Sequence, residues 1–249
     1  RQHIPEAAVP LPTYWHEIQI NNLNFSHEEQ YLSGKTANSL HQLDIKIRRG
    51  HKVALIGESG SGKSTLLSII RGLYLAEKEV RVLIDSQPGG TMGMLANTVT
   101  LFPQDPEIFE NTIAYNITLG LPFTQEEILE VCDTANFTEV LSKLPNHLDS
   151  NIQEKGVNLS GGQKQRLALA RGVLAARSSE IILMDEPTSS VDPKTESLIY
   201  DKMFEEFKDK AVVSTLHRLH LLSKFDYVYI LQDGYIVDQG TFVHLKQNS

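Results

Sequence analysis

Residue types that hold phosphate groups occur together at positions 57–65, which read Gly-Glu-Ser-Gly-Ser-Gly-Lys-Ser-Thr. The three glycines permit a tight turn, and the backbone amides of such a turn can approach an anion closely. Lys63 adds a positive charge for the β- and γ-phosphates, and the Ser64 hydroxyl suits Mg²⁺. An apolar run at 53–56 precedes the turn and a helix-like run at 66–70 follows it, as in a P-loop. The pattern predicts binding of a nucleoside triphosphate through Gly57, Ser59, Gly60, Ser61, Gly62, Lys63, Ser64 and Thr65.

Two acidic side chains follow another apolar run further along the chain. Residues 181–184 read Ile-Ile-Leu-Met, which is typical of a buried strand in a parallel sheet, and Asp185 and Glu186 come next. Ligands of such sheets bind beside the carboxyl ends of the strands, so both acids are expected near the P-loop. A solvated strand end is the alternative, but an Asp-Glu pair after a P-loop favours function. Asp185 resembles the Walker B aspartate, which implies that it holds Mg²⁺ through water, and Glu186 is then expected to orient or deprotonate the attacking water.

A second phosphate-binding feature is predicted at Ser160-Gly161-Gly162, directly before a helix expected to run to about Ala176. A hydroxyl and unobstructed amides at the positive end of a helix suit an anion. The same residues also make an ordinary helix N-cap, and taken alone they favour that interpretation. Because the chain already has a P-loop, the two features could instead close on one nucleotide from opposite sides, across a dimer.

The composition limits the class of protein. The 249 residues are 41% hydrophobic, which is enough for one large domain with a core. A net charge of -8 argues against general nucleic-acid binding. The single cysteine, Cys132, cannot form an internal disulfide and indicates a reducing compartment. No apolar run approaches the length of a membrane span, and the chain, which begins at Arg1, is expected to be a piece of something longer.

The order of the expected elements indicates an α/β fold with a P-loop (RecA-like) core. Alternating apolar residues at 18–25 and 43–47 predict a small antiparallel sheet near the N-terminus. A mainly parallel, doubly wound sheet is predicted from strands at 53–56, 80–85, 98–102, 181–184, 211–214 and 227–231. Residues 86–97 contain three glycines and a proline and are expected to be loop.

The expected domain organisation has three parts. Residues 1–13 carry three prolines and are predicted to be a linker from an upstream domain. Residues 14–249 are predicted to form one domain. Residues 107–158 have a mostly helical pattern, so an inserted helical subdomain is expected at about 107–170.

Three motifs together resemble the ATP-binding cassette (ABC) family. They are the P-loop, Leu159-Ser160-Gly161-Gly162-Gln163 and Leu183-Met184-Asp185-Glu186, and the resemblance covers residues 14 to 245. It implies an ATPase that uses ATP and Mg²⁺. It also implies a head-to-tail dimer with two ATP molecules, each held between the P-loop of one subunit and residues 159–163 of the other.

Three further residues receive roles from this resemblance. Asp192, in Ser189-Ser190-Val191-Asp192, matches the acidic position of the D-loop, although Ser190 replaces the more common alanine. His217 follows a predicted strand and matches the switch histidine, which touches the γ-phosphate beside Glu186; otherwise a lone histidine is a surface or core residue. Gln104 matches the Q-loop glutamine, which reaches Mg²⁺ and senses the membrane partner; otherwise it is part of a polar turn.

The chain departs from the family pattern at two places. His27 stands where exporter-type members usually have the tyrosine that stacks on adenine, and the nearby Tyr31 is an alternative stacking residue. In addition, residues 86–97 lack the usual Asp-Gly turn after the preceding strand.

Two segments resemble exporters within this family. Gln153-Glu154-Lys155-Gly156 is similar to the X-loop that touches the coupling helices, with Lys155 in place of arginine, and Phe109-Glu110-Asn111-Thr112-Ile113 is similar to the segment after the exporter Q-loop. We therefore expect the ATPase domain of an exporter, placed at the cytoplasmic face of a membrane. Its expected partners are a second ABC domain and transmembrane domains, with no nucleic acid.

Other functions stay open at this point. An importer's separate ATPase subunit is the nearest alternative. A soluble ABC ATPase of DNA repair or translation usually carries coiled-coil or tandem-domain insertions, which the sequence lacks. A non-hydrolytic ATP-gated interaction module is disfavoured because Glu186, His217 and the signature are all present.

Overall fold

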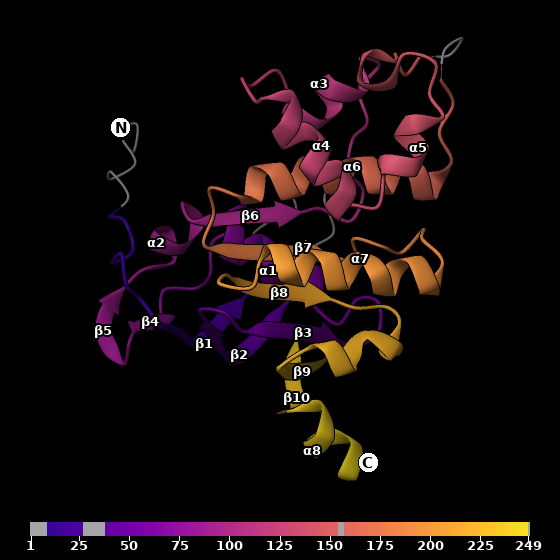
Figure 1. The fold of residues 1–249 in the computed structure, drawn as a ribbon. Helices are drawn as coiled ribbons and strands as arrows, with labels where there is room; N and C mark the ends of the chain where they lie inside the picture. The colour runs from indigo at the N-terminus through magenta and orange to yellow at the C-terminus, as the bar shows by residue number, and fades with distance from the viewer. Residues whose placement is uncertain (1–8, 27–37, 154–156, 249) are drawn as a thin grey trace. The chain divides into compact units, whose positions relative to one another are not determined.

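The computed structural model describes residues 9–26, 38–153 and 157–248. The chain forms two compact units (Figure 1). Unit 1 comprises residues up to 101, residues 180–185 and residues 209–249, and unit 2 comprises residues 102–179 and 186–208. The chain crosses from unit 1 to unit 2 twice, first after residue 101 and again after Asp185. The second crossing separates Asp185 from Glu186, the two acids predicted to act in hydrolysis.

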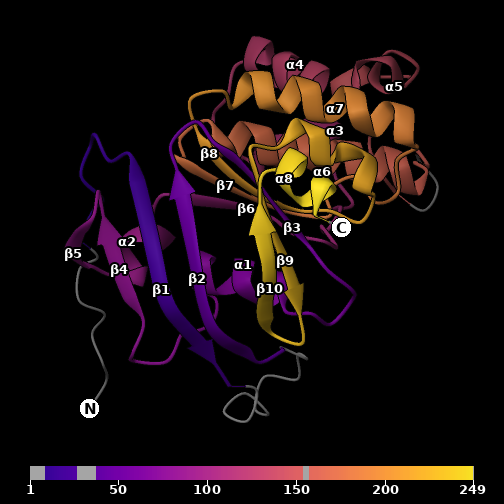
Figure 2. The same ribbon diagram turned by 90° about the horizontal axis from the view of Figure 1, so that it is seen from below.

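One sheet of unit 1 is antiparallel and four-stranded, in the order β2-β1-β4-β5 (Figure 2). Its strands are β1 (Glu17–Phe25), β2 (Leu40–Arg48), β4 (Arg81–Ile84) and β5 (Gln87–Gly90). From residue 43 to the end of β2, buried apolar residues alternate with exposed polar residues, and the buried ones are Leu43, Ile45 and Ile47. This period of two forms a strand with one face on the core, as the sequence predicts.

The other sheet has six strands in the order β10-β9-β3-β8-β7-β6. These are β3 (Lys52–Ile56), β6 (Val99–Phe102), β7 (Ile181–Asp185), β8 (Ala211–Thr215), β9 (Tyr227–Gln232) and β10 (Tyr235–Gly240). The neighbours β9, β3, β8 and β7 run parallel, whereas β10 returns antiparallel to β9. All five residues of β7 and all five of β8 are buried, which explains the apolar runs at 181–184 and 211–213; the buried polar residues Asp185, Ser214 and Thr215 stand at the carboxyl ends. The predicted mainly parallel P-loop fold with an added antiparallel sheet is confirmed. The strand predicted at 80–85 was assigned to the wrong sheet: it forms β4, which pairs antiparallel with β1.

Residues 86–97 were predicted to be loop, and this prediction is wrong. They form β5 and the short helix α2 (Met92–Ala96), whose N-cap Thr91 accepts a hydrogen bond from the backbone of Met94. Asp85 and Ser86 both take positive φ, at 50° and 65°, and so form the two-residue hairpin turn that an Asp-Gly pair would otherwise make. The glycines and the proline of β5 are tolerated because β5 is an edge strand.

The helices described in unit 1 are α1 (Lys63–Arg71), α2, the 3-10 helix η3 (Leu219–Lys224) and α8 (Phe242–Gln247). Three of these four helices bury apolar residues, whereas α8 buries none. In α1, Leu66, Leu67, Ile69 and Ile70 are buried in the main core, together with residues of β1, β2, β3, β7 and β8. The sequence did not predict β10 or α8, which are short and carry weak apolar patterns.

Unit 2 is mainly helical. It contains α3 (Ile113–Thr118), α4 (Gln125–Thr134), α5 (Thr138–Ser142), the 3-10 helix η2 (His147–Asp149), α6 (Gly161–Ala176) and α7 (Pro193–Glu206). The long helix α6 packs against α3 and α4, and α7 packs against α4. Within residues 9–26, 38–153 and 157–248, no helix combines the length and apolar character that crossing a membrane requires.

Candidate functional site

The P-loop of unit 1 links the carboxyl end of β3 to the start of α1, and its backbone requires glycine at two points. Gly57 has φ of 152°, and a Cβ there would lie 2.3 Å from the carbonyl oxygen of Leu231. Gly62 is the N-cap of α1 with φ of 107°, and a Cβ there would lie 2.5 Å from the side chain of Leu40. The Leu231 carbonyl of β9 therefore leaves no room for a Cβ at Gly57, and the positive φ of Gly62, beside Leu40 of β2, favours glycine there.

Polar groups within the loop are arranged for a ligand. Lys63 is buried and its Nζ donates to the carbonyl oxygen of Gly57, so its charge is held inside the turn. The backbone oxygen of Ser61 accepts from Gly234 N at 3.0 Å, which fixes the loop to the β9–β10 turn. The Ser61 hydroxyl is buried without a hydrogen-bond partner in the described part of the chain. A buried hydroxyl without a partner is costly, and an anionic ligand would supply one.

Asp185 lies at the same edge of the sheet as the P-loop. In the parallel register, Thr215 of β8 pairs with Leu55 of β3 on one side and with Asp185 of β7 on the other. The Thr215 hydroxyl donates to Asp185 Oδ1 at 2.9 Å, and both residues are buried. His217 follows β8 by two residues and is exposed at this edge. Unit 1 therefore brings the carboxyl ends of β3, β8 and β7 to one edge of the sheet. The P-loop follows β3, His217 follows β8 and Asp185 ends β7.

The donor set of unit 1 fits a small hard cation. The Asp185 carboxylate and the Ser64 hydroxyl offer oxygen ligands, which Mg²⁺ prefers. Across the described ranges, no three His, Cys, Asp or Glu side chains gather as a metal cluster.

In unit 2, two predicted residues that are 82 positions apart meet directly. Gln104 Nε2 donates to Glu186 Oε2 at 3.1 Å. Glu186 has φ of 46°, in the left-handed region that a non-glycine residue adopts at a cost of about 1–3 kcal/mol. The sequence predicted Gln104 as a metal ligand, but it did not predict this bond to the carboxylate. The bond holds the Glu186 side chain in one orientation.

The signature segment before α6 is satisfied by its own residues. Ser160 is the N-cap, and it exchanges two hydrogen bonds with Gln163: Gln163 N donates to Ser160 Oγ at 3.2 Å and Ser160 N donates to Gln163 Oε1 at 2.9 Å. This is a capping box. A Cβ at Gly161 would meet no atom within 4 Å, so its backbone lies open, whereas one at Gly162 would lie 2.8 Å from the Ser190 carbonyl oxygen. Leu159 is buried.

Gln165 joins the signature helix to the D-loop, and the sequence did not predict this role. Its Nε2 donates to Ser189 Oγ at 3.1 Å, and its Oε1 accepts from Ser190 N at 2.8 Å. The side chain therefore uses both ends of its amide on the two serines. The only signal in the sequence is a polar residue on the buried side of a helix, two positions after the signature.

Asp192 is the N-cap of α7, followed by Pro193 at the first helical position. Its Oδ2 accepts from Thr195 N at 3.0 Å. Hydrogen bonds from Thr195 hold the pKa of this carboxyl below its ordinary value. Behind the cap, the Thr188 hydroxyl donates to the buried carboxylate of Glu196. The D-loop is therefore fixed at both ends.

Of the other predicted contacts, His27, Tyr31 and residues 154–156 lie outside the described residues.

Comparison with known proteins places these features in one family. The profile of the ABC transporter family matches residues 40–189. The chain is 35% identical over 238 residues to a putative multidrug export ATP-binding/permease protein of Staphylococcus aureus, covering 94% of this chain and 40% of that protein. It is 35% identical over 236 residues to the ATP-dependent lipid A-core flippase of Escherichia coli K12, covering 93% of this chain and 39% of that protein.

A solved structure shares the fold as well as the sequence pattern. It is a bacterial Atm1-family ABC exporter with ATP bound, at a TM-score of 0.81 and 30% identity, covering 97% of this chain and 41% of that one. The chain thus spans about two fifths of the length of these relatives.

Proposed function

This chain belongs to the ABC transporter family, and we propose that it is the ATP-binding and ATP-hydrolysing domain of an exporter. The observation that carries the proposal is the carboxyl edge of unit 1. There a turn that favours glycine at Gly57 and Gly62, a buried lysine and a buried hydroxyl with no hydrogen-bond partner among the described residues follow the end of β3. Asp185 stands at the end of β7, fixed by Thr215 of the strand between them.

ATP binding begins with the polar groups of the loop. The backbone amides at the start of α1 take up phosphate oxygens, and Lys63 exchanges its bond to Gly57 for a phosphate oxygen. The Ser61 hydroxyl, which has no partner among the described residues, gains one. Ser64, and Asp185 through water, would hold Mg²⁺, which would neutralise charge on the phosphates. His27 or Tyr31 stacks on adenine.

Hydrolysis depends on three side chains. Glu186 orients or deprotonates the attacking water, and Gln104 holds its carboxylate through the 3.1 Å bond, in addition to its predicted contact with Mg²⁺. His217 donates to the γ-phosphate from the end of β8. Catalysis is mainly positioning and charge stabilisation of the transferred phosphoryl group.

The second half of each site comes from a partner domain, in a head-to-tail dimer. Ser160 and the open backbone at Gly161 face the nucleotide bound to the other subunit. Gln165 ties this segment to Ser189 and Ser190, so the signature and the D-loop, with Asp192, approach the partner together. ATP closes the dimer, hydrolysis opens it, and transmembrane domains attached at the cytoplasmic face of the membrane use this cycle for export.

The test is the ATPase rate measured against protein concentration. We expect the rate to rise faster than linearly, because each site needs two chains, and to fall by at least 100-fold in Glu186→Gln. Glu126→Gln, at an exposed position in the first turn of α4, is the matched control and should keep the normal rate. A normal rate in Glu186→Gln would contradict the assigned base. A linear rate from a chain that sediments as a monomer would contradict the composite site.

A further inference from the structure

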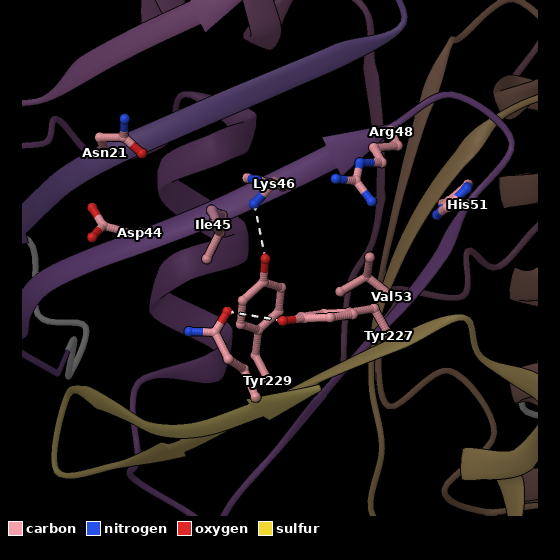
Figure 3. A pocket seen from close by; sticks show the side chains of 10 residues that line it. Asn21, Asp44, Ile45, Lys46, Arg48, His51, Val53, Tyr227 and Tyr229 are labelled. Atoms are coloured by element: carbon pink, nitrogen blue, oxygen red, sulfur yellow. Dashed lines mark hydrogen bonds between the residues drawn. The ribbon is translucent and has the colours of Figure 1, made fainter. Parts of the chain in front are cut away.

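A second cavity lies in unit 1, away from the P-loop, and nothing in the proposed ATPase cycle uses it. It has a volume of about 190 Å³ and is lined from β1, β2, β3, β9 and β10 and from His51 (Figure 3). Its residues come from segments as far apart in the sequence as Asn21 and Gln239, so only the folded chain forms it.

The floor of this cavity is aromatic and apolar. Tyr227 and Tyr229 project from the same face of β9, with ring centroids 5.1 Å apart and planes at 63°. Val53 of β3 is buried beside them. Each hydroxyl is engaged: Tyr229 Oη accepts from Lys46 N at 3.0 Å, and Tyr227 Oη donates to Gln239 Oε1 at 3.1 Å. The two rings are thereby held in place, and a ligand ring packed on either of them could gain the favourable offset or edge-to-face contact of an aromatic pair.

The rim of the cavity is charged, and the charges are separated. Arg48 and His51 stand at one end and Asp44 at the other, with Lys46 between them (Figure 3). Asp44 Oδ1 already accepts from Asn22 N at 2.8 Å, and Arg48 is paired with Glu17 at 2.6 Å. The exposed ammonium of Lys46 is therefore the cation that an incoming anion would meet first.

We propose that this cavity binds small aromatic carboxylates with a single ring. A cavity of about 150 Å³ lined with apolar groups holds one benzene molecule, so about 190 Å³ suits a ring with a short acidic substituent. The ring packs on Tyr227 and Tyr229, and the carboxylate points to Lys46 and Arg48 at the rim. This site is separate from the ATP site and does not depend on the proposed function.

The experiment is a titration of the nucleotide-free chain with benzoate, followed by ¹H–¹⁵N NMR. We expect saturable shifts centred on β9 and the end of β2, with a dissociation constant of roughly 0.1–1 mM, the range for a ligand of this size. Benzyl alcohol, which lacks the charge, and cyclohexanecarboxylate, which lacks the aromatic ring, should each bind several-fold more weakly. Lys46→Glu should weaken benzoate binding by roughly tenfold, because it reverses the nearest charge. Lys78→Glu, at an exposed position elsewhere in unit 1, should not.

Several outcomes would overturn the proposal. Shifts that never saturate, or that centre on the P-loop, would show that the cavity is not a binding site. Equal binding of benzyl alcohol would exclude recognition of the anion, and equal binding of cyclohexanecarboxylate would exclude recognition of the ring. Unchanged affinity in Lys46→Glu would place the ligand elsewhere. Because Lys46 is exposed, that variant should fold, and its unshifted NMR signals will verify this.

Discussion

The P-loop before α1 and the signature segment before α6 are both glycine-rich turns that lead into a helix, yet their polar groups are in different states. In the P-loop, the Ser61 hydroxyl is buried without a partner in the described part of the chain, and Lys63 is buried against a backbone carbonyl. In the signature, Ser160 is already bonded to Gln163 in both directions. The P-loop thus offers polar groups that a ligand could satisfy, whereas the polar groups of the signature are satisfied by its own residues.

This difference explains how the P-loop and the signature segment can act at different steps of nucleotide binding. A site whose own groups are unsatisfied gains the most from binding, so the P-loop takes the nucleotide first. The signature segment is already capped, so it keeps its conformation before the partner subunit's nucleotide binds. Only its open backbone at Gly161 needs to form a new contact with that nucleotide. The following predictions test that division, from the largest expected effect to the smallest.

Removal of the P-loop cation should have the largest effect. Lys63→Ala deletes a buried charge that we assign to phosphate, and charge-assisted hydrogen bonds contribute about 1.5–3 kcal/mol. ATP affinity should therefore fall roughly 10- to 150-fold, measured with a fluorescent ATP analogue. Lys164→Ala removes an exposed cation from the signature helix and should leave the affinity unchanged. Equal losses in the two variants would mean that both segments take part in first binding.

The two signature glycines should respond differently to a methyl group. In Gly162→Ala the new Cβ would lie 2.8 Å from a backbone oxygen of Ser190, so the D-loop must shift, at a cost of about 1–3 kcal/mol in the free energy of unfolding. Gly161→Ala meets open space and should change stability by less than about 0.5 kcal/mol. Denaturant unfolding measures both values. Gly161→Ala should nevertheless lower the ATPase rate at high protein concentration, where the dimer forms. Similar destabilisation in both variants would contradict the packing described for Gly162.

The two serines give a direct comparison of a bonded and an unbonded hydroxyl. Ser160→Ala removes an N-cap and should destabilise the protein by about 1 kcal/mol. Ser61→Ala removes a buried hydroxyl that has no partner among the described residues, so the unliganded protein should be as stable or more stable, while ATP affinity falls. Thr124→Ala, at the N-cap of α4, is the matched control and should cost about as much as Ser160→Ala. Destabilisation by Ser61→Ala in the absence of ATP would show that its hydroxyl has a partner after all.

The sequence predicts the fold better than it predicts the contacts that complete the site. Strong signals, such as the apolar runs of β3, β7 and β8, fix the sheet because a buried parallel strand tolerates few other residues. The 86–97 segment was missed because Asp85 and Ser86 form the turn that usually contains glycine. The bonds of Gln104 to Glu186 and of Gln165 to Ser189 join residues 82 and 24 positions apart. Such pairings depend on the tertiary structure, which no local pattern encodes.

The smallest expected effect concerns the charge at the D-loop cap. Hydrogen bonds from Thr195 hold the pKa of Asp192 below its ordinary value of 3.8, which means that the folded protein binds this proton less readily than the unfolded chain. The stabilisation is therefore fully present above pH 3.8 and is lost as the pH falls through the lower, folded pKa.

Asp192→Asn isolates the pH-dependent stabilisation by the Asp192 charge, because asparagine caps a helix about as well as aspartate but does not titrate. We expect the variant's melting temperature to depend less on pH than that of the parent chain between about pH 5 and pH 2. Near neutral pH the variant should lose only a small part of its stability, since the cap itself remains and the site is exposed to solvent. Asp105→Asn, at an exposed position with no cap to form, is the control and should follow the parent chain. If Asp192→Asn also follows the parent at every pH, then the cap acts through its hydrogen bond alone, and the D-loop would resemble the uncharged cap of Ser160 rather than the charged cradle of the P-loop.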